Sequence, residues 1–390
     1  MRTIAVVTTS RADYGVYLPV LRRIQEEPDL KLLLIVSGMH LSPEFGLTVN
    51  NIADDGFDIC AKVEMLLSSD TPEGIAKSMG LGTIGYAQAY ARLQPDILLV
   101  LGDRFEMHAA AVSALPFKIP VAHIHGGEIT EGAIDDALRH SMTKLSHLHF
   151  VATEEYRDRV QQMGEEPWRV VVSGAPSLDN LHSMKVLNHG ELETHTGLHL
   201  NDNPLLVTYH PVTLEHEDTE WQVGELLQAL RESNFPIVFT MPNADTNGRV
   251  IIRMLEEFVA NYPQAQMADN LGTKGYFGLM ATAAAMVGNS SSGIVEAPSF
   301  GLPVVNIGTR QKGRLRARNV IDVGYERDKI LTGIREAVNL EFRSSLGGEA
   351  NPYGDGHASE KIIEKLKRVP LGEDLIKKRF HQIPCQKREN

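Results

Sequence analysis

Cysteine is almost absent from this chain of 390 residues, in which Cys60 and Cys385 are the only two. Two cysteines so far apart provide neither a disulfide framework nor the ligand spacing of a zinc site, which is typical of a reducing cytoplasm. No apolar run reaches the length of a membrane span. The first residues predict a β-strand, without the basic segment, apolar core and cleavage site of a signal peptide. We therefore expect a cytoplasmic protein.

Long basic tracts are also missing. The chain has 38 Lys and Arg against 50 Asp and Glu, a net charge of -12. This balance disfavours nucleic-acid binding and binding to an anionic membrane surface, although a local arginine cluster could still bind phosphates. No repeat or low-complexity tract is present. No Gly-x-Gly-x-x-Gly motif follows the first predicted strand and no Walker loop occurs, which disfavours dinucleotide-dependent redox enzymes and P-loop kinases.

What the chain does have is an alternation of short apolar, β-branched runs with amphipathic segments. This pattern predicts an α/β protein with parallel sheets covered by helices. We expect two doubly wound, Rossmann-like domains, residues 1–182 and 183–368, that face each other across a central cleft. A polar interval, 183–203, reads as a linker, and the tail 369–390 could return to the first domain. The strands are predicted at 4–8, 32–36, 96–101, 120–123, 149–152 and 170–172, then at 204–208, 236–241, 285–288, 303–307 and 320–323.

The most informative segment is a run of small hydroxyl residues after one of these strands. Gly288-Asn289-Ser290-Ser291-Ser292 leads into a predicted helix at 293–300. The first turn of a helix presents unpaired N–H groups and the positive end of its dipole, so a phosphate can bind there. Glu296 lies one turn further on, within reach of a sugar hydroxyl of a bound nucleotide. The plain alternative is that Ser290 only caps the helix.

Charged and imidazole side chains follow most of the other predicted strands. In doubly wound sheets, ligands bind at the carboxyl ends of the strands, so these loops are expected to line one cleft. An arginine at such a position can clamp a diphosphate, because its planar fork binds oxygens in pairs. The residues are Arg11, His40, Asp103, Arg104, His123, His125, Glu128 and Asp135 in the first domain, and His210, Asn243 and Arg310 in the second.

Structural alternatives exist for each of these residues. Asp13 could cap its helix and pair with Arg11, Asp103 with Arg104 could be a local salt bridge, and Asp135 could complement a helix dipole. A lone His210 is more often structural than catalytic. His123 and His125 suggest a metal site, but no third ligand at a familiar spacing accompanies them, so we expect no metal. The shared position at strand ends favours a site, and the expected substrate is a sugar nucleotide.

The loop sequences together resemble a known family, over roughly residues 3 to 368. They resemble the hydrolysing UDP-N-acetylglucosamine 2-epimerases of bacterial sialic-acid synthesis and the epimerase half of the bifunctional animal enzyme. The motifs occur in order: Arg11-Ala12-Asp13-Tyr14, Gly38-Met39-His40-Leu41, Gly102-Asp103-Arg104, His123-Ile124-His125-Gly126-Gly127-Glu128, Ile134-Asp135-Asp136, Arg139-His140, His210-Pro211-Val212-Thr213, Gly288-Asn289-Ser290-Ser291 and Gly308-Thr309-Arg310-Gln311.

The resemblance implies the glycosyltransferase-B fold, a UDP-sugar substrate, and no metal or nicotinamide cofactor. It also implies conversion of UDP-N-acetylglucosamine and water to N-acetylmannosamine and UDP, through elimination to 2-acetamidoglucal and hydration. We expect a homodimer or homotetramer. The candidate catalytic residues are Asp103, Asp135, His125, Glu128 and His210. The candidate substrate- and UDP-binding residues are Arg11, His40, Arg104, His123, Asn243, Ser290, Ser291, Glu296 and Arg310.

One departure from the family and one substrate question stay open. Many relatives carry Glu where this chain has His125, so either His125 or Glu128 takes the second acid–base role. A subgroup of the family acts on UDP-2,4-diacetamido-2,4,6-trideoxyhexose on the route to legionaminic acid, and this is the alternative substrate. A glycosyltransferase or a non-catalytic nucleotide-sugar-binding regulator would fit the same fold.

Overall fold

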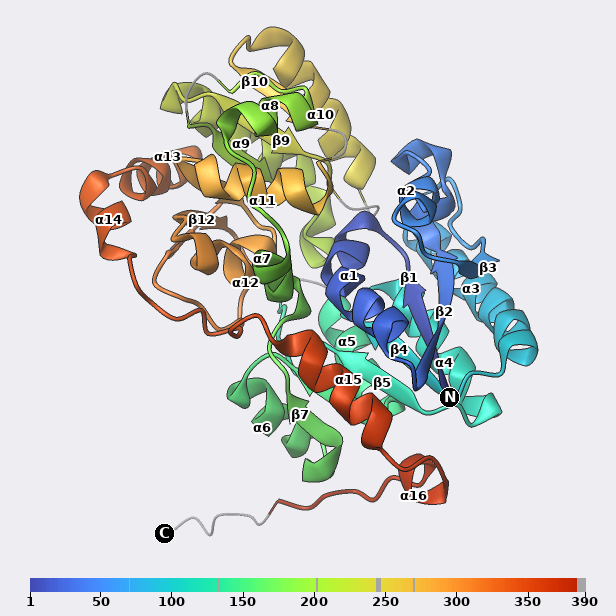
Figure 1. The fold of residues 1–390 in the computed structure, drawn as a ribbon. Coiled ribbons are helices and arrows are strands. Elements are labelled where there is room, and N and C mark those ends of the chain that lie inside the picture. The colour runs from blue at the N-terminus through green and yellow to red at the C-terminus, as the bar shows by residue number, and fades with distance from the viewer. Residues whose placement is uncertain (70, 132–133, 201–202, 243–246, 269–270, 384–390) are drawn as a thin grey trace, which may run out of the picture.

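Two parallel sheets form the framework of the molecule (Figure 1). The computed structural model describes residues 1–69, 71–131, 134–200, 203–242, 247–268 and 271–383. The first sheet has the strand order β3-β2-β1-β4-β5-β6-β7, and every pairing is parallel. Its strands are β1 (Arg2–Thr8), β2 (Leu30–Ser37), β3 (Ile59–Val63), β4 (Ile97–Leu101), β5 (Val121–Ile124), β6 (Leu148–Val151) and β7 (Val170–Val172).

The second sheet repeats this topology, with the order β10-β9-β8-β11-β12-β13. In each sheet the strand order reverses at one point, between β1 and β4 in the first and between β8 and β11 in the second. Ligands of doubly wound sheets bind at such switch points. The strands are β8 (Leu205–Thr208), β9 (Ile237–Thr240), β10 (Ala265–Ala268), β11 (Ala285–Gly288), β12 (Val304–Ile307) and β13 (Val320–Val323).

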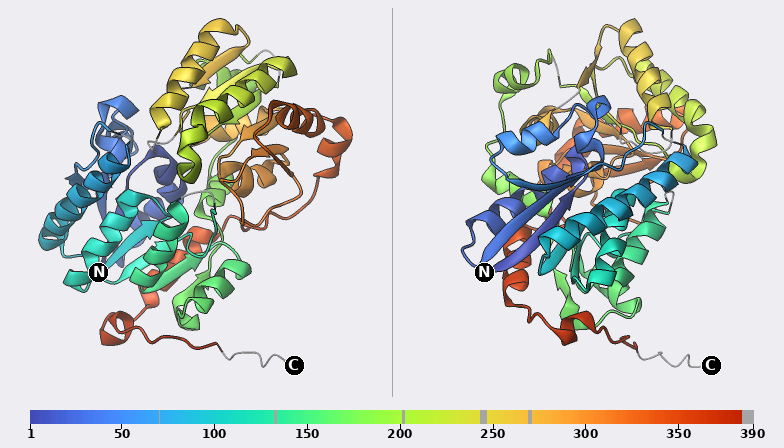
Figure 2. Two further views of the ribbon diagram at one scale, coloured as in Figure 1. Left: turned by 180° about the vertical axis from the view of Figure 1, so that it is seen from behind. Right: turned by 90° about the vertical axis from the view of Figure 1, so that its right-hand side faces the viewer.

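Helices cover both faces of each sheet, as two views from other sides also show (Figure 2). With the first sheet are α1 (Arg11–Glu26), α2 (Val49–Asp54), α3 (Pro72–Leu93), α4 (Phe105–Ala114), α5 (Asp135–Leu145), α6 (Glu154–Gln162), α7 (Asp179–Ser183), and the 3-10 turns η1 (Gly38–Leu41), η2 (Pro43–Phe45), η3 (Leu115–Phe117), η4 (Pro167–Arg169) and η5 (Pro176–Leu178). With the second are α8 (His189–Thr196), η6 (Thr213–Asp218), α9 (Thr219–Ser233), α10 (Gly248–Asn261), α11 (Gly272–Thr282), α12 (Ser292–Val295), η7 (Ala297–Phe300), α13 (Arg327–Ala337) and α14 (Leu340–Ser345). Two helices, α15 (Ala358–Arg368) and α16 (Glu373–Ile376), follow.

The strand predictions fall on observed strands, and the fold class is confirmed. Two strands were missed, β3 and β10. Both lie at the edge of their sheet and carry polar or half-buried residues, so they lack the continuous apolar run of a central strand. The interval read as a linker contains α8, whose N-terminus is closed by a capping box between Asn188 and Glu191.

The end of the chain returns to the first sheet. Helix α15 packs on α1, and its Ile362 and Leu366 belong to the hydrophobic core of the first sheet. The guanidinium of Arg2 donates to the backbone carbonyls of Leu366 and Val369. In Figure 1, α15 lies beside α1, and α16 lies at the same end of the molecule as the N-terminus.

Candidate active site

A cleft of about 710 Å³ opens between the carboxyl ends of the two sheets. It is lined by the loops that follow β1 and β4 on one wall and β8 and β11 on the other, which are the two switch points. Of the candidate residues that the structure describes, all but His123 line it. Asn243 lies outside the described residues. The argument from strand ends therefore placed in one cleft residues that are far apart in the sequence, from Arg11 to Arg310.

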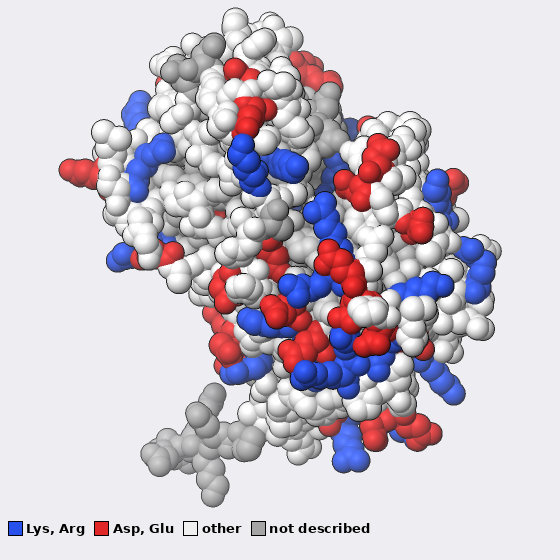
Figure 3. Space-filling view, in the orientation of Figure 1, with Lys and Arg blue, Asp and Glu red and all other residues white. Residues whose placement is uncertain are grey.

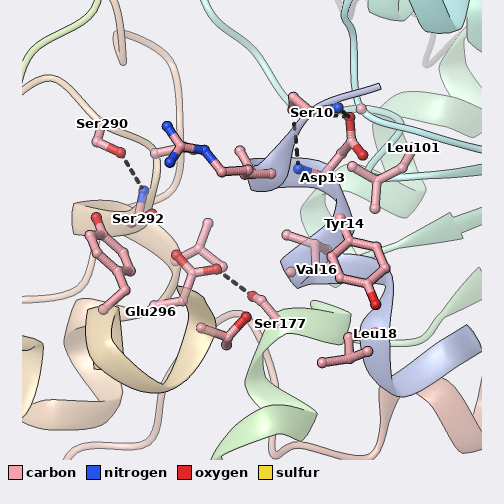
Figure 4. Close-up of a pocket in the computed structure, with 18 of the residues that line it drawn as sticks. Ser10, Asp13, Tyr14, Val16, Leu18, Leu101, Ser177, Ser290, Ser292 and Glu296 are labelled. Atoms are coloured by element: carbon pink, nitrogen blue, oxygen red, sulfur yellow. Dashed lines mark hydrogen bonds between the residues drawn. The ribbon is translucent and has the colours of Figure 1, made fainter. Parts of the chain in front are cut away.

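The turn after β1 is fixed by a buried carboxylate. Asp13 and Ser10 form a capping box at the start of α1 (Figure 4). The Asp13 carboxylate also accepts bonds from Thr8 and Thr9. This confirms the capping alternative for Asp13. His40 is buried between the hydroxyls of Thr8, at 3.0 Å, and Thr48, at 2.7 Å. Burial lowers the pKa of His40, so the ring is held neutral within this network.

Asp103 follows β4 and pairs with a buried arginine from helix α5. The Nη2 of Arg139 contacts its carboxylate, while Nη1 donates to the carbonyl of Glu128 and to the Thr130 hydroxyl, both at 3.1 Å. Arg104, the next residue, bonds Glu106 through two nitrogens at 3.0 and 3.2 Å. Asp103 and Arg104 therefore each have a charged partner of their own, Arg139 and Glu106.

The loop after β5 separates the two histidines of the His-Ile-His motif. His123 is fully buried, and its Nε2 is 2.7 Å from the carbonyl oxygen of Gly102. Burial lowers the pKa of His123 to about 3, so it is a neutral support for the turn that carries Asp103. His125 instead has a left-handed φ of 64°, which turns its side chain into the cleft. The two imidazoles therefore do not converge.

Glu128 connects His125 to the second domain. Its Oε1 lies 2.6 Å from Nδ1 of His125, and its Oε2 lies 2.9 Å from Nη2 of Arg314. Burial opposes ionisation of Glu128, but Arg314 and His125 outweigh it and hold the pKa of Glu128 below its usual value. The glycine before Glu128 is required, because Gly127 has a φ of 79° and a Cβ there would lie 2.5 Å from a backbone oxygen of Tyr156.

The opposite wall is built on the hydroxyl run. Gly288 has a φ of 137°, and a Cβ would lie 2.0 Å from a carbonyl oxygen of β8, so only glycine brings β11 so close. Asn289 fixes the loop after β8 through two bonds to the backbone of His210, at 2.7 and 2.9 Å. Arg310 donates to the carbonyl of Asn289 at 3.2 Å. Burial, with Arg310 and Arg104 nearby, lowers the pKa of His210 well below its ordinary value.

Glu296 is a buried carboxyl group on this wall. Ser177, from the first domain, donates to it, and the two side chains face each other in Figure 4. Burial raises the pKa of Glu296 to about 7 from an ordinary value of 4.5. Ser290 accepts a bond from the backbone N–H of Ser292 at 3.3 Å, in the turn before helix α12, whose N-cap residue is Ser291 rather than Ser290. Ser291 makes no capping bond with its side chain.

Several functional candidates were missed from the sequence. Arg139 lies inside a helix, Ser177 lies in the turn η5 after β7, and Arg314 lies beyond Arg310 in the loop after β12. A search of the residues directly after each strand therefore does not find them. The spacing of Asp135 and Arg139 along one helix face was the available signal for Arg139. Tyr276 on α11 also lines the cleft, and burial raises its pKa.

The charge on the surface is mixed. On the face shown in Figure 3, acidic and basic side chains are interspersed and are densest over the first domain. Among the residues that the structure describes, no cluster of three or more His, Cys, Asp and Glu side chains is arranged to hold a metal ion. No described helix has the length and apolar character needed to span a membrane.

Two doubly wound domains with a cleft between their strand ends define the glycosyltransferase-B fold. A crystal structure of UDP-N-acetylglucosamine 2-epimerase from Neisseria meningitidis, bound to UDP-N-acetylglucosamine, superposes with a TM-score of 0.80. It has 20% identity and covers 95% of this chain and 100% of that one. This likeness shows the fold.

Sequence comparison identifies the family. The family model described as UDP-N-acetylglucosamine 2-epimerase matches residues 22–367. The UDP-N,N'-diacetylbacillosamine 2-epimerase (hydrolyzing) of Legionella pneumophila is 39% identical, over 97% of this chain and 99% of its own length. The GDP/UDP-N,N'-diacetylbacillosamine 2-epimerase (hydrolyzing) of Campylobacter jejuni is 41% identical, over 97% and 98%. The chain belongs to the UDP-N-acetylglucosamine 2-epimerase family, among its hydrolysing members.

Proposed function

We propose that the protein is a hydrolysing 2-epimerase of UDP-2,4-diacetamido-2,4,6-trideoxyhexose, the sugar nucleotide also called UDP-diacetylbacillosamine. The sequence motifs alone favoured UDP-N-acetylglucosamine and kept this hexose as the alternative. The names of the relatives at 39% and 41% identity support the alternative better. The reaction releases the free 2-epimer of the hexose and UDP.

The observation that best supports this function is that the two walls of the cleft carry different chemical groups. One wall presents the carboxylates of Asp103 and Asp135 and the imidazole of His125, which are groups that accept and donate protons. The other wall presents Arg310, Ser290 and Ser291, which are donors suited to a diphosphate. A substrate that is anionic at one end and carries a reacting C–H bond at the other fits such a cleft.

The chemistry follows from these groups. A base removes the proton at C2, the electron pair forms the C1=C2 bond, and the C1–O pair leaves with UDP. Hydrogen-bond donors on the diphosphate stabilise the charge that develops on the departing oxygen. Water then adds its oxygen to C1, while a proton reaches C2 from the opposite face. The net reaction consumes one water and inverts C2.

The candidate residues divide between these steps. Asp103 is held by Arg139 and Asp135 opens helix α5, so both present a carboxylate on the sugar side. Arg11, Arg104 and Arg310 lie on the diphosphate side. Glu296 accepts a hydrogen bond from Ser177, and a ribose hydroxyl can take the place of that donor. His210 is neutral and buried, and it shapes the pocket near Arg310.

The test uses the purified protein in deuterated water with three substrates: UDP-diacetylbacillosamine, its GDP-linked analogue and UDP-N-acetylglucosamine. NMR of the products should show UDP and the free 2-epimer with deuterium at C2, formed fastest from UDP-diacetylbacillosamine. Faster turnover of UDP-N-acetylglucosamine would mean that this sugar nucleotide is the substrate instead. Product without deuterium at C2 would contradict the elimination. No nucleotide release without an added acceptor would point to a transferase.

A further inference from the structure

A buried chain of three side chains crosses from one domain to the other beside the cleft. His125 and Glu128 belong to the loop after β5 in the first domain, and Arg314 belongs to the loop after β12 in the second. The distances are 2.6 Å between His125 Nδ1 and Glu128 Oε1, and 2.9 Å between Glu128 Oε2 and Arg314 Nη2. The side chains of Glu128 and Arg314 are only 2% and 9% exposed, so solvent does not screen this pair.

The hydrogen bond fixes which nitrogen of His125 carries the proton. Arg314 keeps Glu128 ionised, and an ionised carboxylate can only accept hydrogen bonds. Nδ1 of His125 must therefore be the donor. In the neutral ring the lone pair is then on Nε2, for which the described residues provide no hydrogen-bonding partner. Since His125 lines the cleft, this lone pair is available to a substrate proton.

The loop that carries Arg314 is anchored to both domains. Its Leu315 N–H donates to the Tyr156 hydroxyl at 3.0 Å, and its Leu315 carbonyl accepts from Tyr353 at 2.8 Å. Two residues before Arg314, Lys312 pairs with Glu131 at 2.7 Å and its carbonyl accepts from the Glu131 N–H. The same loop holds Arg310 in the cleft. Arg310 and Arg314 lie four positions apart in this loop, so one loop contacts both the diphosphate side of the cleft and the Glu128–His125 pair.

We propose that Arg314 is a positioning residue, which reaches across from the nucleotide-binding domain to Glu128 and thereby sets His125 as the base that removes the C2 proton. This rests on the proposed function. Glu128 then orients the base and does not itself exchange the proton, which resolves the choice left open by the sequence. A catalytic base positioned in this way is complete only when the two domains lie together.

The step balances with the groups present. Nε2 of His125 accepts the C2 proton, the C2–H electrons form the C1=C2 bond, and the C1–O electrons leave with UDP. In the hydration, water supplies hydroxyl to C1, and its proton reaches C2 through a carboxyl group on the opposite face, Asp103 or Asp135. The His125 imidazolium then loses its proton to solvent.

The chain offers a matched control for the test. Glu131 and Lys312 join the same two loops, but their side chains are 49% and 67% exposed and lie outside the cleft lining. Arg314→Ala and Glu128→Gln should each lower kcat by roughly 10²-fold, the cost of misplacing a reacting group by about 1 Å. Lys312→Ala and Glu131→Gln should leave kcat unchanged. UDP affinity, measured by calorimetry, should stay within twofold in all four variants.

The double variant Glu128→Gln with Arg314→Met guards against misfolding, because it removes both buried charges at once. We expect it to fold and to show the same fold-loss in kcat as either single variant, since the two residues act through one contact. A second measurement is independent of turnover. Nitrogen-15 NMR of the His125 ring, assigned by its loss in His125→Gln, should show Nδ1–H in the wild type and a mixture of tautomers in Arg314→Ala.

The outcomes separate this proposal from the proposed function. A wild-type protein that turns over none of the three sugar nucleotides would refute the proposed function, while the NMR result would still report the tautomer. An active wild type whose Arg314→Ala and double variants keep full kcat would overturn the positioning role alone. Arg314→Ala that weakens UDP binding at unchanged kcat would also overturn it, because Arg314 would then be a diphosphate ligand.

Discussion

The two walls of the cleft share a topology but hold their side chains in different ways. On the first wall, Asp103 and His125 are each oriented by a charged partner, Arg139 and Glu128. On the second wall, the loops are fixed by backbone contacts, such as those of Asn289 with His210. A group that moves a proton must hold one geometry and one protonation state, which ionic partners provide. A diphosphate site needs only converging donors.

Two arginines that line the cleft, Arg139 and Arg314, sharpen this comparison. Arg139 acts within its own domain and binds Asp103, Glu128 and Thr130. Arg314 reaches Glu128 from the other domain. One of the proposed acid–base groups, Asp103, is therefore held within a single domain, whereas the other, His125, is held by contacts that involve both. Substitutions on the first wall should change turnover, and substitutions on the second should change nucleotide affinity.

The largest effect is expected from the carboxylates of the first wall. Asp103→Asn and Asp135→Asn keep the size of the side chain and remove its basicity, so each should lose about 10²–10⁴-fold in turnover. UDP affinity should stay nearly normal. Asp136→Asn is the control, because Asp136 shares the first turn of α5 but lies outside the cleft lining. Near-normal turnover in both variants would remove these carboxylates from the mechanism.

Glu296 should give the next effect, on stability. Its folded-state pKa is raised from 4.5 to about 7, so between these pH values the unfolded chain binds fewer protons than the native protein. Stability therefore falls as pH rises through this window, by on the order of 3 kcal/mol. Glu296→Gln removes this loss, so its Tm should exceed that of the wild type at pH 8 more than at pH 4.5. Parallel Tm curves would contradict the shift.

Arg310 and Arg11 test the diphosphate side. Removing either guanidinium by substitution to Ala should weaken UDP binding by roughly 1.5–3 kcal/mol, the scale of a hydrogen bond to a charged group. Calorimetric titration with UDP measures the change directly. Unchanged affinity in both variants would mean that the diphosphate binds elsewhere.

The smallest effect separates two neighbouring serines. The Ser290 hydroxyl accepts a bond from the backbone N–H of Ser292 in the turn before α12, so Ser290→Ala should cost about 1 kcal/mol of stability. Ser291 makes no such bond, so Ser291→Ala should leave the Tm unchanged. Both should lower turnover if both hydroxyls face the diphosphate. Full turnover in Ser290→Ala, with only a lower Tm, would mean that this serine stabilises its turn and does not contact the substrate.

The sequence predicted the site through one rule, that parallel strands end at one edge of a sheet. This rule placed Asp103, His125, Ser290 and Arg310 in one cleft, because each follows a strand or lies in the loop after it. The rule failed for His123. The alternation of side chains along a strand predicts that His123 and His125 point to the same side of the sheet, but only His125 lines the cleft. The left-handed backbone at His125 breaks the alternation.

Long-range partners could not be predicted in the same way. Nothing in the local sequence pairs Arg314 with Glu128, or Ser177 with Glu296, because those contacts join segments that are more than 100 residues apart. The edge strand β3 was missed because its lysine and half-buried residues weaken the apolar signal. By contrast, α8 carried a readable capping signal in Asn188 and Glu191.

The return of α15 to the first sheet has a consequence for biosynthesis. The partners of Arg2 are the carbonyls of Leu366 and Val369, so strand β1 meets a segment that is made 364 and 367 residues later. The second sheet is synthesised in between, which takes roughly 10–40 s at about 5–20 residues per second. During that interval the nascent first domain leaves the apolar surface of α1 uncovered on the ribosome. Loss of α15 would make that exposure permanent, because Ile362 and Leu366 complete the core of the first sheet.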